Sequence, residues 1–281
     1  MNNDKKKSVA IGRALLSGPY LIWMIGFTII PLALIFWYGI TTKNGNLTLA
    51  NITAIMSPDH WKALWLSLGL SLISTVLCLV LAYPLAMILR GRGSSASGFI
   101  VFIFILPMWM NFLLRTLAWQ TLLEKSGVIN GILSSLHLPN QNLINPPGAI
   151  VLGMVYNYLP YMILPLYTVM EKIDKSVIEA AHDLGCNNVK TMFKVVVPLS
   201  MPGIMSGITM VFVPAISTFI ISRMLGGGSN LLIGDLIEMQ FLGNSYNPNL
   251  GAAISLVLMV IILLIMTILN QFDDDEDKVL M

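Results

Sequence analysis

Residues 171–194 read EKIDKSVIEAAHDLGCNNVKTMFK and separate two long stretches, 148–170 and 195–222, that contain no charged residue. A helix needs about 20 apolar residues to cross a bilayer, and both flanking stretches reach that length. The charged segment is therefore predicted to be a loop that joins two membrane-spanning helices.

The loop carries the pattern of two short helices. Ser176 and Glu179 have the S-x-x-E spacing of a capping box, which satisfies free amides at a helix start, and they predict a helix over 177–184. Gly185 can supply the left-handed residue that ends this helix. A second, amphipathic helix that stops near Pro198 is indicated by apolar residues at i, i+3, i+4 and i+7, namely Val189, Met192, Phe193 and Val196. We expect a compact helix-turn-helix.

The rest of the chain has the composition of a membrane protein. Of its 281 residues, 56% are hydrophobic and 11% are charged, against about a quarter charged in soluble domains. Mean hydropathy is +0.79. Apolar stretches predict six spans, the third interrupted only by Arg115. We expect an all-α membrane protein with a single transmembrane domain over 1–281 and spans at about 19–40, 63–89, 96–122, 148–170, 195–222 and 250–270.

The basic residues of the loops predict the orientation. Six spans place both termini on one side of the membrane. The loops on that side hold eleven of the 16 Lys and Arg residues, namely Lys5, Lys6, Lys7, Arg13, Arg90, Arg92, Lys172, Lys175, Lys190, Lys194 and Lys278. The positive-inside rule places this side in the cytoplasm. Both termini and the loop 171–194 are therefore expected to be cytoplasmic.

Both chain ends have features of their own. The N-terminus combines a basic head with an apolar core, as a signal peptide does, but the core continues for more than 20 residues without an evident small-residue cleavage site. A retained first helix is the preferred interpretation. The tail 271–281 contains an acidic run from Asp273 to Asp277, and because like charges repel, we expect it to be solvated and disordered.

Prolines and glycines indicate how the spans pack. Proline frees backbone groups that must be satisfied inside protein or beside water, so the spans either bend around a cavity or carry ordinary kinks. Gly203 and Gly207 have small-xxx-small spacing, which lets another helix approach closely, within this chain or in a second subunit. Five of the six spans contain proline, namely Pro31, Pro84, Pro107, Pro160 with Pro165, and Pro214.

The loop 171–194 and the residues after it resemble the EAA loop of ABC importer permeases. The family pattern is EAA, three residues, Gly, nine residues and Ile-x-Leu-Pro. Here Glu179-Ala180-Ala181, Gly185 and Val195-Val196-Val197-Pro198 have that spacing, with valine in place of isoleucine and leucine. The resemblance implies a type I ABC importer permease architecture with six transmembrane helices and a cytoplasmic coupling helix-turn-helix. It implies that Glu179, Ala180, Ala181, Gly185 and Pro198 couple the permease to an ATPase.

The residue types fit this role. The small side chains of Ala180 and Ala181 would let the groove of a partner protein approach closely. Glu179 offers a carboxylate at the helix start, and Gly185 sets the angle between the two helices. The sequence contains no G-x-x-x-x-G-K-[ST] phosphate-binding loop. No cofactor is therefore expected in this chain, and ATP and magnesium are expected to bind to a separate ATPase.

Further stretches resemble the polyamine (spermidine/putrescine) importer permeases, specifically the PotB type of their two permease subunits. The resemblance implies a bacterial inner or plasma membrane protein that works with a second homologous permease, two copies of a cytoplasmic ATPase and an extracytoplasmic polyamine-binding protein. Which polyamine is preferred stays open. The stretches are Leu106–Asn111 with Arg115, Gly153–Tyr156 through Leu159-Pro160 to Pro165–Tyr167, and Asn230–Asp235 through Gln240-Phe241.

A linear polycation needs carboxylates or aromatic ring faces, which attract ammonium groups. The alternative is that these aromatic residues are interface anchors or packing groups. Arg115 opposes a cation path, and the preferred interpretation places it near the outer end, bonding carbonyl groups of the partner. Candidate pathway residues are Trp109, Tyr156, Tyr158, Tyr161, Asp235 and Glu238.

Other functional classes fit less well. An ion-coupled secondary transporter should show buried acidic residues in its spans or symmetric broken helices. A membrane enzyme should show a catalytic motif, and none is found; His60, His137 and His182 lack metal-site spacing. The net charge of +2 gives no reason to expect nucleic-acid binding, and Cys78 and Cys186 are not expected to form a disulfide. An ABC importer permease for another small solute remains the main alternative.

Overall fold

The computed structural model describes residues 18–90, 94–144, 146–228, 230–243 and 246–279. Its regular structure is helical, apart from one isolated β-bridge between Thr41 and Leu47. The chain divides into two compact units, residues 1–57 with 239–260 and residues 58–238 with 261–281, so the division falls within α14 (Ile233–Leu242) and α15 (Pro248–Val279). Each unit is described by itself.

The first unit is built on the helix Gly18–Gly39, which contains a π-helical turn, Ile25–Ile29, directly before α2 (Ile30–Gly39). Proline at position 31 has no N–H to donate, which fits a change of hydrogen-bond pattern at this point. Two amide side chains satisfy the carbonyls at and beyond the helix end: Asn249 Nδ2 donates to Tyr38 O (3.0 Å) and to Thr41 O (2.8 Å), and Asn51 Nδ2 also donates to Thr41 O (2.8 Å).

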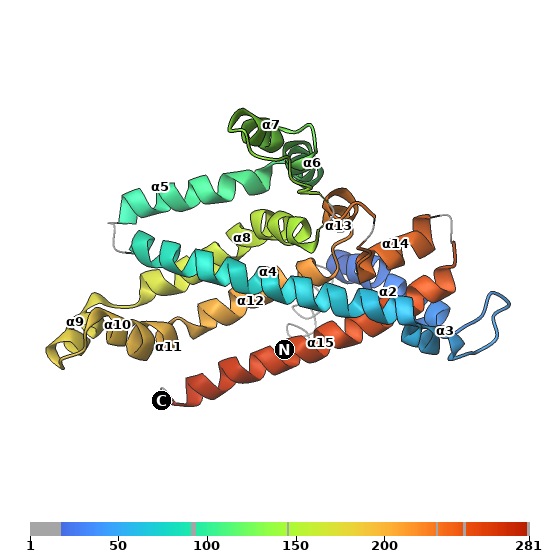
Figure 1. Ribbon diagram of the computed structural model, residues 1–281. Coiled ribbons are helices and arrows are strands. Elements are labelled where there is room, and N and C mark those ends of the chain that lie inside the picture. The colour runs from blue at the N-terminus through green and yellow to red at the C-terminus, as the bar shows by residue number, and fades with distance from the viewer. Residues whose placement is uncertain (1–17, 91–93, 145, 229, 244–245, 280–281) are drawn as a thin grey trace, which may run out of the picture. The chain divides into compact units, whose positions relative to one another are not determined.

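The second unit has a core of three long helices, α4 (Pro58–Arg90), α8 (Pro147–Lys172) and α12 (Met201–Ile216), which run side by side in Figure 1. α8 is the central one, and many of its side chains are fully buried, including Met154, Met162, Ile163, Leu166 and Met170. A helix that is apolar all round is typical of the core of a large protein or of a membrane span.

The small residues of α12 face this central helix. A Cβ added at Gly207 would lie 2.5 Å from Met162 Sδ, and one added at Gly203 would lie 3.1 Å from Pro165 O. Of the two contacts that the glycine spacing allowed, the structure thus shows the internal one. The glycines let α12 approach α8 to a distance that a larger side chain would prevent.

Replacing Gly203 with isoleucine is therefore expected to lower stability by about 1–3 kcal/mol, because the added atoms meet a backbone oxygen that cannot move aside. Thermal unfolding of the purified complex would measure this. Gly69→Ile in α4 is the matched control, since a Cβ there meets nothing within 4 Å. Equal unfolding midpoints for the two variants would contradict the packing role of Gly203.

Two predicted spans are bent helix pairs. The stretch 96–122 consists of α5 (Ser94–Ile105), a 3-10 turn (Leu106–Trp109) and α6 (Phe112–Leu123), and α7 (Val128–Ser135) follows. The segments Phe99–Trp109 and Phe112–Ser135 meet at 88°. The predicted span 96–122 is broken within its length, because Asn111 starts a new helix by accepting hydrogen bonds from Leu113 N (2.8 Å) and Leu114 N (3.3 Å).

The other bend lies at Ser200, where Asn188–Leu199 and Met201–Ile216 meet at 67°. The predicted span 195–222 therefore contains a break, and its straight helix ends at Ile216. A separate short helix, α13 (Ile220–Leu225), follows and leads to α14. In the described residues four helices are long and apolar enough to cross a membrane, or up to six if each bent pair counts as one span.

The acidic tail also differs from its prediction. α15 continues through the run from Asp273 and ends at Val279, although we expected disorder there. Extending a helix that already exists needs no new nucleation step, so charge repulsion alone does not end it. The basic residues at positions 5–13 lie outside the described residues.

Candidate coupling loop and pathway residues

The loop after α8 contains α9 (Lys175–Asp183), and its start differs from the predicted capping box. The N-cap is Asp174, whose side chain accepts a hydrogen bond from Ser176 N (3.1 Å), and Ser176 lies inside the helix. The same bond lowers the pKa of Asp174. The cap therefore stabilises the helix above the ordinary carboxyl pKa, and this contribution is lost as the pH falls through the lowered one.

Gly185 ends α9 as predicted. Its φ is +81°, the left-handed region that disfavours residues with a Cβ. Gly185 N donates to His182 O (2.9 Å) and Cys186 N donates to Ala181 O (3.0 Å). These two bonds form a Schellman motif, which satisfies the last carbonyls of α9 and fixes the direction of the chain that leaves it.

The second arm of the loop begins with α10 (Asn188–Thr191), capped by Asn187, whose side chain accepts from Lys190 N (2.8 Å). A π-helical turn, Met192–Val196, and α11 (Val197–Leu199) follow. The helix Asn188–Leu199 ends one residue after Pro198, as predicted, and the bend at Ser200 follows.

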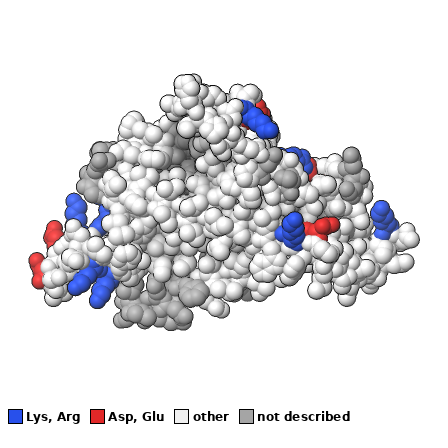
Figure 2. Space-filling model, viewed as in Figure 1, with Lys and Arg blue, Asp and Glu red and all other residues white. Residues whose placement is uncertain are grey.

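The loop exposes apolar side chains. Val177, Leu184, Val189 and Phe193 are 41%, 86%, 63% and 64% exposed, and we call them, with Glu179 and Ala180, the coupling surface. In the face shown in Figure 2, charged side chains gather over α9 and α10, whereas the middle of α4 carries none. Clustered exposed apolar groups of this kind mark interaction sites.

Two expectations about this surface were wrong. Ala181 was expected to share the low outer surface with Ala180, but it is 7% exposed and faces the interior of the loop. Val189 and Phe193 were expected to share one apolar face with Met192 and Val196. The structure divides that stripe: Val196 is buried, and Phe193 points outward because the π-helical turn changes the angular spacing between them.

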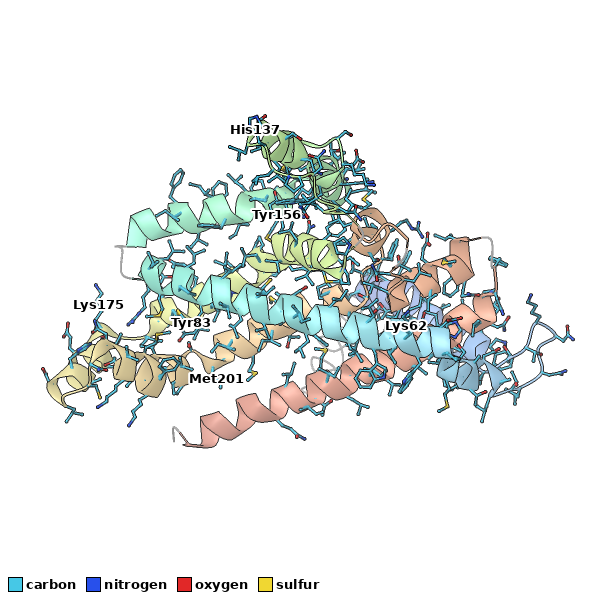
Figure 3. The ribbon with its side chains drawn as sticks, in the orientation of Figure 1. Lys62, Tyr83, His137, Tyr156, Lys175 and Met201 are labelled. Atoms are coloured by element: carbon cyan, nitrogen blue, oxygen red, sulfur yellow. The ribbon has the colours of Figure 1, made fainter. Side chains whose placement is uncertain are left out.

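Two polar contacts that the sequence reasoning missed attach this loop to the helix core. Arg90 Nη2, at the end of α4, donates to Ile173 O (2.6 Å), directly before α9. The Tyr83 hydroxyl on α4 lies 3.1 Å from Ser200 Oγ at the bend, and Figure 3 shows Tyr83 and Met201 close to this junction. The only sequence signal was the position of Arg90 at the end of a span.

A cavity of about 290 Å³ lies between the end of α4 and α9, lined by Met87, Arg90, Lys175, Ile178 and Glu179. Arg90 thus connects α4, the end of α8 and α9. These contacts join the loop to the helix core, and Met192 and Val197 of the second arm also pack against it.

The aromatic pathway candidates have different environments. Tyr158 is buried, its hydroxyl donates to Pro214 O (3.3 Å), and its ring lies 6.3 Å from that of Tyr161. Tyr156 forms an edge contact with Trp119 at 5.3 Å, and Trp109, 75% exposed, forms one with Phe102 at 5.7 Å. The structure brings Tyr158 and Tyr161 together, and the packing interpretation describes Tyr158 best.

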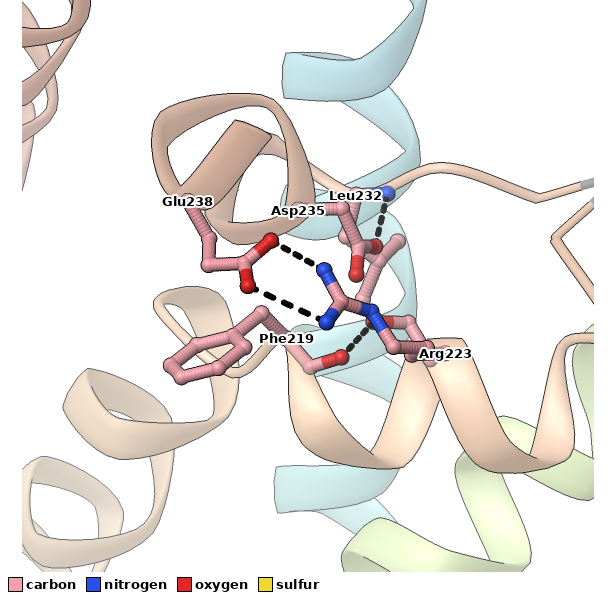
Figure 4. A network of polar contacts seen from close by, with 6 residues as sticks. Phe219, Arg223, Leu232, Asp235 and Glu238 are labelled. Carbon is pink, nitrogen blue, oxygen red and sulfur yellow. Dashed lines mark hydrogen bonds and ion pairs between the residues drawn. The ribbon is translucent and has the colours of Figure 1, made fainter. Parts of the chain in front are cut away.

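The acidic candidates lie together on α14, but they already have partners (Figure 4). Glu238 forms an ion pair with Arg223 of α13 through both carboxylate oxygens. Asp235 is 2% exposed, and its Oδ2 accepts from Leu232 N (2.8 Å), while its Oδ1 has no partner among the residues that the structure describes. Burial raises the pKa of Asp235. No local sequence pattern indicated this ion pair, because its two residues are 15 positions apart.

Arg115 was expected to bond to carbonyl groups of a second subunit. Its side chain is only 5% exposed, so little of it is available for such bonds. Its Nε and Nη1 atoms have no hydrogen-bond partner within the described ranges. The guanidinium carbon lies 6.0 Å from the centre of the Phe112 ring, one turn earlier on α6. An aromatic face replaces only part of the lost hydration.

Comparisons with known proteins identify a matching family and similar proteins. Residues 47–275 match the family described as binding-protein-dependent transport system inner membrane component. The chain is 35% identical over 247 residues to the spermidine/putrescine transport system permease protein PotB of Escherichia coli K12, covering 85% of this chain and 90% of that one. The corresponding protein of Haemophilus influenzae is 35% identical over 251 residues, covering 86% and 87%.

A solved structure of similar fold is a bacterial ABC transporter involved in the import of the acidic polysaccharide alginate. One of its chains superimposes with a TM-score of 0.81 at 17% identity, over 97% of both chains. This likeness concerns the fold.

Proposed function

This chain belongs to the binding-protein-dependent transport system inner membrane components, the permease subunits of ABC importers, and we propose that it serves the ATP-driven import of polyamines. The family confirms the predicted all-helical, multi-pass inner membrane protein without catalytic activity. The observation that carries the polyamine proposal is the 35% identity to PotB proteins of two organisms over 85–86% of the chain.

In this proposal the chain forms half of the translocation pathway, opposite a second homologous permease. The coupling surface binds one of two cytoplasmic ATPase copies, which hold ATP and magnesium, and an extracytoplasmic polyamine-binding protein delivers the solute. Glu179, Ala180, Gly185 and Pro198 carry the coupling role at the surface or in the backbone of the loop. Ala181 supports it from inside the loop, since it is buried.

The proposal is tested by uptake of labelled spermidine into proteoliposomes that contain the permease pair, the ATPase and the binding protein. We expect ATP-dependent uptake that excess putrescine or spermidine inhibits and that lysine or a neutral sugar does not. Uptake inhibited equally by lysine, or no spermidine uptake by a complex that imports another solute, would favour the alternative of a permease for a different small molecule.

The proposed orientation places both termini and the coupling surface in the cytoplasm, and single cysteines test it. In a Cys186→Ser background, Asn44→Cys, in the exposed segment 43–47, should react with a membrane-impermeant maleimide added to intact cells, and Asn188→Cys should not. Cys78 is buried and gives little background. The opposite labelling pattern would reverse the orientation.

A further inference from the structure

The contact between α13 and α14 pairs one cation with two carboxylates (Figure 4). Arg223 is the only Lys or Arg in the sequence between Lys194 and Lys278. Its guanidinium donates to both oxygens of Glu238, with Nη1 3.0 Å from Oε1. This bidentate arrangement matches the fork of a guanidinium to the plane of a carboxylate.

The second carboxylate lacks a full set of partners. Asp235 lies one turn before Glu238, on the same side of α14, and interacts electrostatically with both Arg223 and Glu238. Its Oδ1 is buried and accepts no hydrogen bond of good geometry in the part of the chain that the structure describes, although the neighbouring Ser222 side chain favours the ionised form of this carboxyl. A buried acceptor without a donor costs free energy. Burial raises the pKa of Asp235, and when both acids are ionised, the single base Arg223 leaves one negative charge unbalanced. The cluster can therefore take another cation.

The two members of the ion pair differ in exposure. The side chain of Arg223 is 53% exposed, whereas that of Glu238 is 15% exposed. Arg223 can therefore swing into solvent while Glu238 stays in place on α14. Ion pairs with an exposed partner contribute little net stability, so exchanging this guanidinium for another cation costs little.

We propose that Arg223 is an exchangeable counterion, which occupies Glu238 in the absence of substrate and is displaced by an ammonium group of a linear polyamine. The incoming ammonium binds to Glu238 and is further attracted by the ionised carboxylate of Asp235, one turn away on α14. Guanidinium and ammonium groups both carry one positive charge and N–H donors, so they compete for the same oxygens. The inference rests on the proposed polyamine function and adds Arg223 as a residue that sets affinity.

If Arg223 exchanges with substrate, substitutions at Arg223 and at Glu238 should change the affinity for spermidine in opposite directions. Equilibrium binding of labelled spermidine to the complete reconstituted complex, without the binding protein, would measure them. Arg223→Gln removes the competitor and should tighten binding about threefold to tenfold, whereas Glu238→Gln removes the acceptor and should weaken it about tenfold. Arg223→Lys keeps the charge but loses the fork, and it should lie between wild type and Arg223→Gln.

Lys125→Gln is the control for general electrostatic attraction, because it removes one exposed positive charge from a loop predicted to lie on the same side of the membrane. Its spermidine binding should equal that of wild type. Arg223→Lys decides the question if Arg223→Gln fails to assemble, since a purely structural ion pair predicts weaker binding for it and an exchangeable counterion predicts tighter binding.

Weaker binding in both Arg223→Gln and Glu238→Gln, restored by the charge-swapped Arg223→Glu/Glu238→Arg variant, would show a structural ion pair and overturn the exchange. Unchanged binding in Arg223→Gln would overturn it as well. Spermidine uptake by the wild-type complex with its binding protein separates the two proposals. If there is no uptake, the polyamine function fails and the exchange fails with it. If there is uptake but the variants show a structural ion pair or unchanged binding in Arg223→Gln, only the exchange fails.

Discussion

A Gly185→Val complex is expected to lose about nine-tenths of its substrate-stimulated ATP hydrolysis and transport. Gly185 has a φ of +81°, and a left-handed conformation costs a β-branched residue about 1–2 kcal/mol. A cost of 1.4 kcal/mol shifts an equilibrium tenfold. Valine would therefore favour a negative φ, break the bond from Cys186 N to Ala181 O, and change the angle between the two arms of the coupling loop.

The defect in this variant is conformational and not steric, since a Cβ at Gly185 meets nothing within 4 Å. Gly45 provides a matched control: its φ is +80°, a Cβ there also meets nothing, and it lies in a different loop. Gly45→Val carries the same strain and should keep coupling. Gly185→Asn should keep most of it, because asparagine tolerates the left-handed region. Equal losses in Gly45→Val and Gly185→Val would remove the special role of Gly185.

Hydropathy predicted the helices of this protein well because a bilayer requires long apolar stretches and satisfies no backbone group on its own. The predicted spans 63–89 and 148–170 fall inside α4 and α8. The bends were harder to predict, because most of the prolines do not break a helix here. Helices continue through Pro84, Pro160, Pro165 and Pro214.

One bend is marked by a local helix cap and the other by a tertiary contact. Asn111 caps α6 after the turn that contains Pro107, and the Tyr83 hydroxyl meets Ser200 at the start of α12. The first signal is local and could have been read from the sequence, since asparagine is a preferred N-cap. The second joins residues 117 positions apart, and no local pattern contains it.

The difference between local signals and tertiary contacts also explains which features of the candidate site were predicted correctly. The EAA spacing and Gly185 are local features, and the helix end at Gly185 was predicted. The helix start was wrong because Asp174 and Ser176 are both good caps, and the sequence does not rank them. Which carboxylates are free depends on tertiary contacts. Glu238 was expected to be available, but α13 brings Arg223 to it.

An Arg115→Met complex is expected to unfold at a temperature a few degrees higher than wild type while losing about nine-tenths of its transport. A buried charge without full hydrogen bonding costs several kcal/mol, and Nε and Nη1 of Arg115 have no partner within the described ranges. Methionine has a similar length and needs no partner, so the folded state should gain about 1–2 kcal/mol, or roughly 2–4 °C per kcal/mol for a domain of this size.

The missing hydrogen-bond partners of Arg115 are also the reason to expect a loss of transport. An ionisable residue inside a membrane span is costly and marks a functional position by default, and an importer moves between conformations in which such a group can gain its missing partners. The thermal midpoint and ATP-driven uptake of one preparation measure both effects. Arg90→Met is the control, because Arg90 donates to Ile173 O and its loss should lower the midpoint. A lower midpoint for Arg115→Met as well, or wild-type uptake, would show that Arg115 is an ordinary paired residue or has no role in transport.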